Sequence, residues 1–215
     1  MSLDDELAAQ RQRAWEARSP EERKVRARAV EEVDEAGIPA GALTVGDSIP
    51  SITLADALGR QVSILQLLES GSVVISFYRG GWCPYCNLEL RALQGKLPEL
   101  QALGATLVAI SPELPDLSLS TAEKNGLSFP VLSDVGNQVA REFKLVHRIA
   151  PEVVAYQLGN GNDVAAFNGA DVAEVPLPAT YVVDQGGRIE YAFVSADYTR
   201  RGDPDEVVAA VRKLR

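Results

Sequence analysis

The chain has 215 residues, of which 46% are hydrophobic and 24% charged, a composition typical of a soluble globular protein with one full hydrophobic core. Thirty acidic residues face twenty-one basic ones, and the formal charge of -9 disfavours binding to nucleic acids or to anionic membrane surfaces. No apolar run is long enough for a signal-peptide core or a membrane helix, so we expect a cytoplasmic protein.

The N-terminal 43 residues are predicted to form a helical extension and a linker. Sparse apolar residues among charges of both signs over 4–36 indicate one or two helices, with a break at Ser19-Pro20. Glycines and a proline from Gly37 to Gly46 are typical of a linker. We therefore divide the chain into an extension, 1–43, and a main domain, 44–215.

Strands and helices are predicted to alternate along the main domain. Apolar or β-branched runs predict strands over 49–54, 72–78, 105–110, 130–132, 179–184 and 188–194, the last two as a hairpin. Helices are predicted over 63–69, from the cysteines to Gly104, over 138–145 and after Asp203-Pro204. The segment 112–129 is predicted to be a loop and a helix that ends at Asn125-Gly126. Residues 146–176 show no sustained period and are expected to be an irregular insertion. This order predicts an α/β protein with a mixed central sheet flanked by helices.

The chain's two cysteines, Cys83 and Cys86, lie where the second predicted strand ends and a helix begins. Pro84 suits the first helical position and makes Cys83 the N-cap, with Cys86 in the first turn. A helix N-terminus stabilises a thiolate, and a cap residue with non-helical dihedrals allows a three-residue pair to close into a disulfide. Arg79 adds a positive charge nearby, so the sequence predicts a redox pair.

Two other interpretations of the cysteines are structural burial and zinc binding. Buried structural cysteines are common, but the strand-to-helix position and the proline between them favour chemistry. A structural zinc site needs four ligands, and with no other cysteine and only His147 available the chain is short of them. We therefore expect no metal and no cofactor.

Several segments together resemble the peroxiredoxin (alkyl hydroperoxide reductase and thiol-specific antioxidant) family, in a Cys-x-x-Cys branch of the thioredoxin-fold superfamily. The resemblance covers about 44–214 and is carried by the strand before the cysteines, Gly80-Gly-Trp-Cys-Pro-Tyr-Cys86, Ser111-Pro112, Phe129 to Asp134, Pro178 to Asp184 and Tyr198 to Arg201. It implies a thioredoxin-like fold.

Laid over the family's motif without gaps, the chain has Cys86 at the peroxidatic position and Glu89 at the family's glutamate. Arg79 stands where the family has proline, and Cys83 where it has the threonine or serine that binds peroxide. The thioredoxin side of the resemblance, like the capping argument, instead favours Cys83 as the nucleophile. The resemblance therefore implies a redox pair and leaves its order open, with the overlay favouring Cys86.

Further site residues follow from the same resemblance. Arg200 or Arg201 matches the arginine that steadies the thiolate, and Arg201 is our candidate. Pro178 matches the cis-proline that faces the cysteines of the thioredoxin fold. With Arg79, Gly81 and Trp82, it forms the predicted substrate-binding set. His147 has no acidic neighbour in sequence and is expected to be a surface histidine.

These features predict a thiol peroxidase for hydrogen peroxide or small organic hydroperoxides, reset by a thioredoxin-like or low-molecular-weight thiol. A thiol–disulfide oxidoreductase acting on proteins is the alternative, and a redox-sensing binding protein is a third hypothesis. The sequence leaves the oligomeric state open, and the contacts of a homodimer would be sought on the N-terminal helices.

Overall fold

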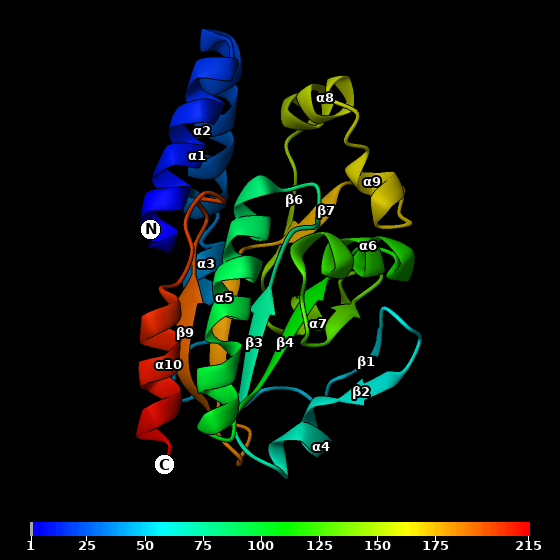
Figure 1. Cartoon of the computed structure of the whole chain (residues 1–215). Helices are drawn as coiled ribbons and strands as arrows, with labels where there is room; N and C mark the ends of the chain where they lie inside the picture. Colours follow the sequence, from blue (N-terminus) through cyan, green and yellow to red (C-terminus); the bar gives the residue numbers. More distant parts are fainter. Residues whose placement is uncertain (1) are drawn as a thin grey trace.

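A computed structural model describes residues 2–215 and places a twisted sheet between two layers of helices (Figure 1). The seven strands of the sheet are β1 (Thr53–Asp56), β2 (Gln61–Ser63), β3 (Val73–Phe77), β4 (Thr106–Ser111), β5 (Val131–Ser133), β8 (Ala179–Val183) and β9 (Ile189–Val194). They lie in the order β2-β1-β5-β4-β3-β8-β9. The predicted α/β class with a mixed sheet is confirmed.

Parallel pairing at the centre of the sheet sets the position of the site. β3 pairs in parallel with β4, and β4 with β5, whereas β8 runs antiparallel to β3. Every residue of β3 and β8 is buried, as expected for apolar strands covered on both faces. Because β3 and β4 are parallel, the segments that follow them emerge at the same edge of the sheet.

Helices cover both faces of this sheet. The helices of the main domain are α4 (Ile64–Leu68), α5 (Pro84–Ala102), α6 (Pro115–Asn125), α7 (Gln138–Glu142), α8 (Pro151–Gly159), α9 (Val164–Phe167) and α10 (Pro204–Lys213). Apolar side chains of α5 and α10 pack on one face of the sheet, and those of α4 and α7 pack on the other. Each face therefore has its own hydrophobic core.

The N-terminal extension forms the two predicted helices, α1 (Leu3–Ala17) and α2 (Pro20–Glu35), followed by a short α3 (Ile38–Gly41). The Ser19 side chain accepts a hydrogen bond from Glu22 N, so the break falls where the sequence placed it. α1 packs against α5, and α2 contacts α8. No residue of α2 is fully buried, although α1 buries Leu7. The domain division at 43/44 stays a prediction.

Two sequence-based expectations about the main domain were wrong. The segment 146–176 is not irregular: it forms β6 (Val146–Arg148), α8, α9 and β7 (Glu174–Pro176). β6 and β7 pair with each other in a separate two-stranded sheet, and three-residue strands are too short to show a period in sequence. The first strand of the domain is β1, which begins later than the expected 49–54 segment.

Across residues 2–215, no helix combines the length and the apolarity that a membrane span requires.

Candidate redox site

The loop between β3 and α5 can pass close to its neighbours because it contains two glycines. Gly80 has a φ of +145°, and a Cβ there would lie 2.3 Å from Trp82 Nε1. At Gly81 a Cβ would meet Thr121 Oγ1 at 2.0 Å. Neither position can accept a larger side chain without displacing its neighbours.

Cys83 is the N-cap of α5 and Pro84 is its first residue, as predicted. Cys83 has extended dihedrals, φ -89° and ψ 113°, and its side chain makes no capping hydrogen bond. Cys86 lies in the first turn, and both cysteines are free thiols. The backbone amides and the dipole of a 19-residue helix therefore act on both sulfurs.

Two arginines bring positive charge to the two sulfurs. Arg79 Nη1 lies 3.9 Å from Cys83 Sγ, and Arg201 Nη2 lies 2.9 Å from Cys86 Sγ. Burial opposes ionisation of Cys83, but a hydrogen bond from Cys86 and the charges of both arginines outweigh it. The pKa of Cys83 is therefore lowered well below the usual value for a thiol, which favours its thiolate form.

The pKa of Cys86 moves in the opposite direction. Burial raises the pKa of Cys86, and the hydrogen bond to Cys83 and the negative charge of Cys83 raise it further. Because the two thiols lie at one helix end and act on each other, the ionisation of one raises the pKa of the other.

Arg201 is held in place by a buried acid from α5. Arg201 Nε lies 2.5 Å from Glu89 Oε2, and both side chains are at most 1% exposed. Thr180 donates a hydrogen bond of 3.0 Å from Oγ1 to Glu89 Oε1. Arg200, the other candidate of the sequence analysis, is exposed. The structure therefore brings Arg201, and not Arg200, to the cysteines.

A small cavity gives access to one of the two sulfurs. Cys83 is 1% exposed and Cys86 is fully buried. A cavity of about 280 Å³ is lined by Cys83, Arg79 and Trp82, together with residues of α1, α2 and the end of α8. The Arg79 guanidinium lies between the rings of Trp82 and Tyr198, 4.8 Å from each centroid. Cys83, and not Cys86, therefore lines this cavity.

Glu113 is a site residue that sequence reasoning missed. It follows β4 directly, and its Oε2 accepts a 2.8 Å hydrogen bond from Gly81 N in the cysteine loop. The pKa of Glu113 is raised to about 7. Burial is the largest cause, the nearby Cys83 raises the pKa further, and the hydrogen bond from Gly81 opposes both effects. Its position after a predicted strand could have indicated it, because the segments that follow parallel neighbouring strands emerge at the same edge of the sheet.

Two predicted site residues behave differently from expectation. No peptide bond of residues 2–215 is cis, so the expected cis bond before Pro178 was wrong. Leu177 N donates to Leu145 O and Ser195 N donates to Pro178 O, and an extended trans chain satisfies both bonds. His147 is half-buried on β6 and is therefore not a free surface histidine. Burial, and then the charge of Arg79, lower the pKa of His147 to about 4.

A mixed sheet with helices on both faces, and a Cys-x-x-Cys pair at the N-terminus of the helix after β3, define a thioredoxin-like fold. The sequence model of the AhpC/TSA family matches residues 45–192, and the chain belongs to that family. The predicted family is thereby confirmed.

Relatives and solved structures agree with this assignment. Peroxiredoxin Bcp of Escherichia coli K12 is 32% identical over 101 residues, 47% of this chain and 64% of the relative. Thiol-disulfide oxidoreductase ResA of Geobacillus thermodenitrificans is 27% identical over 150 residues, 69% of this chain and 68% of the relative. The crystal structure of Peroxidoxin BcpB from Mycobacterium tuberculosis superposes with a TM-score of 0.63 at 23% identity. That match covers 80% of this chain and 99% of BcpB. The chain thus spans less than two thirds of the length of the Bcp relative, and the structural likeness confirms the fold.

Proposed function

We propose that the chain is a thiol peroxidase that reduces hydrogen peroxide or small organic hydroperoxides through Cys83 and Cys86. One observation carries the proposal: Cys83 caps a helix N-terminus beside Arg79 and lines a cavity of about 280 Å³. That space suits a peroxide, whereas a sulfur that is 1% exposed cannot meet a folded protein's disulfide without movement. Family membership supports the same chemistry.

In the proposed reaction, the Cys83 thiolate attacks one peroxide oxygen and the O–O bond breaks. The leaving oxygen takes a proton and departs as water or an alcohol, and Cys83 becomes a sulfenic acid. The Cys86 sulfur then attacks Cys83 Sγ, releasing water and forming a disulfide. Two electrons have passed from the thiols to the peroxide, and an external thiol returns them.

Cys83 is proposed as the first nucleophile, although the motif overlay favours Cys86. Cys83 has the lowered pKa and the surface that lines the cavity. Cys86 has a raised pKa and no exposed surface, which suits a thiol that reacts second, at short range. In this proposal Arg79 stabilises the Cys83 thiolate and Arg201 stabilises charge at Cys86.

The remaining predicted residues have proposed positioning roles. Gly81 and Trp82 shape the wall beside Cys83, with Gly81 fixed through its bond to Glu113. Pro178 is assigned a backbone role, since its carbonyl accepts from Ser195 N.

Matched cysteine variants test the order of events. Cys86→Ser is expected to accumulate a trappable sulfenic acid on Cys83 after one equivalent of hydrogen peroxide, whereas Cys83→Ser should react slowly and trap little. The reverse pattern would restore Cys86 as the peroxide-reactive sulfur. Equal, slow oxidation of both variants and of the parent chain would contradict a peroxidase.

A thiol–disulfide oxidoreductase is the second candidate, favoured by the Cys-x-x-Cys pair itself and by the match to ResA over 150 residues. It predicts fast reduction of insulin disulfides and slow peroxide turnover, the opposite of the peroxidase. The proposed reductant of the peroxidase is a thioredoxin-like protein or a low-molecular-weight thiol. Action in the cytoplasm is part of the same proposal, since its thiol pool returns disulfides to dithiols.

A further inference from the structure

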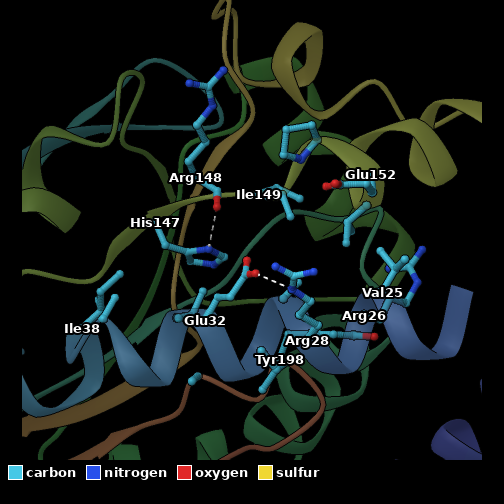
Figure 2. A pocket seen from close by; sticks show the side chains of 18 of the residues that line it. Val25, Arg26, Arg28, Glu32, Ile38, His147, Arg148, Ile149, Glu152 and Tyr198 are labelled. Carbon is cyan, nitrogen blue, oxygen red and sulfur yellow. Dashed lines mark hydrogen bonds and ion pairs between the residues drawn. The ribbon is translucent and has the colours of Figure 1, made fainter.

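A second, larger hollow lies between the N-terminal extension and the β6–α8 segment. Its volume is about 850 Å³, within the range of about 300–1,000 Å³ of small-molecule sites. In Figure 2, α2 forms one wall, and His147, Arg148, Ile149 and Glu152 form the other. The wall from α2 lies outside residues 45–192, so this groove is not built from the family-matched segment alone.

The wall of the groove is mainly apolar. The α2–α3 side contributes Val25, Ala29, Val30, Val33, Ala36 and Ile38. The opposite side contributes Val146, Ile149, Ala150, Pro151, Val153 and Ala196. Such a wall favours an aliphatic body over a sugar or a nucleotide.

The charges of the groove favour an anion. Four arginines and two glutamates line it, in a chain whose net charge is -9. Arg26 pairs with Glu22, and Arg28 pairs with Glu32. Within residues 2–215, neither of the other two arginines, Arg79 and Arg148, has a carboxylate within 4.0 Å. The second lining glutamate, Glu152, has no lysine or arginine nitrogen within that distance. With neutral His147, Arg79, Arg148 and Glu152 leave one net positive charge when Cys83 is in a disulfide, and one monoanion would balance it; a Cys83 thiolate beside Arg79 offsets that charge in the dithiol form.

Arg79 connects the groove to the redox pair. It lines both the groove and the Cys83 cavity, and it is 5% exposed. Its Nε is buried without a hydrogen-bond partner among the described residues. The anionic atom closest to its guanidinium is Cys83 Sγ at 3.9 Å, and a buried guanidinium without an anion is costly.

We propose that the groove between α2 and the β6–α8 segment binds an aliphatic monocarboxylate, whose carboxylate pairs with Arg79 and whose chain lies on the apolar wall. Closing Cys83 into a disulfide removes the thiolate charge that Arg79 faces. The carboxylate therefore binds the disulfide form more tightly than the dithiol form. By linkage, the ligand stabilises the disulfide by the same factor. The redox dependence rests on the disulfide of the proposed function, whereas binding to the groove does not.

Decanoate is the probe, with decyltrimethylammonium and 1-decanol as controls for charge and for the chain alone. Calorimetric titration is expected to show decanoate binding to the full-length dithiol form, and binding about fivefold tighter or more to the disulfide form made with diamide. The cation should bind neither form. No decanoate binding to either form, or equal binding of decanoate and its cationic analogue, would overturn the site. Equal decanoate affinity for the two forms would overturn the pairing with Arg79.

Tryptophan substitutions on two sides of α2 locate the site. Ala29→Trp and Ala36→Trp fill the groove at two places and should abolish decanoate binding, whereas Ala27→Trp, on the exposed side, should not. All three should keep the oxidation rate with hydrogen peroxide. Unchanged binding in both groove variants would overturn the location. Because binding to the dithiol form needs no peroxide chemistry, failure of the groove and failure of the peroxidase are separate results.

Discussion

Replacing Arg79 tests whether one guanidinium makes Cys83 the resting thiolate. Two unit charges 3.9 Å apart interact by about 4 kcal/mol at an effective dielectric constant of 20. Arg79→Met keeps an unbranched side chain between Trp82 and Tyr198 and removes the charge. We expect the pKa of Cys83 to rise toward the ordinary value of a thiol, and only part of the way because Arg201 still contributes.

The assay is the pH dependence of alkylation by iodoacetamide in a Cys86→Ser background, followed with thiolate ultraviolet absorbance. The reactive thiolate is present above the pKa of Cys83 and is lost as the pH falls through it, so Arg79→Met should shift the midpoint upward. Arg200→Met is the matched control, because this exposed arginine touches neither sulfur, and it should leave the midpoint in place. An unchanged midpoint in Arg79→Met, or an equal shift in Arg200→Met, would refute the assignment of Arg79.

Three further predictions concern buried charges. Arg201→Met should lower the free energy of unfolding by about 3–5 kcal/mol, because it leaves Glu89 buried and unpaired, and adding Glu89→Leu should restore much of the loss in urea unfolding. Glu113→Gln should stabilise the protein at pH 8 by up to about 3 kcal/mol and have little effect at pH 4. The wild-type carboxyl, with its folded pKa raised to about 7, loses stability as the pH rises from its unfolded value toward 7, and thermal unfolding at both pH values measures the difference. The single histidine, His147, should titrate by NMR with a midpoint near 4, and a midpoint near 6.5, the ordinary pKa of a histidine, would show that its side chain is solvated.

The start of α5 could be predicted from sequence because all its signals are local. A β-branched apolar run, two glycines, and proline directly after Cys83 determine where the strand ends and the helix begins. The same logic located the break at Ser19 and the Asp203 cap of α10. Such features depend on residues within one helical turn, and the structure confirms each of them.

The contacts of the site could not be predicted, since they join residues that are distant along the chain. Arg200 and Arg201 look alike in sequence, and the packing of Arg201 against Glu89 separates them. Glu113 reaches the cysteine loop through the parallel pairing of two strands. His147 gains its wall position from pairing with β7, across a segment with no periodic pattern.

The most direct test of the central claim is mass spectrometry of the reduced full-length chain after one equivalent of hydrogen peroxide. The account predicts the loss of two hydrogens per chain and a peptide in which Cys83 is disulfide-linked to Cys86. A chain that keeps both thiols, or that accumulates oxygen on one sulfur without forming this bond, would contradict it.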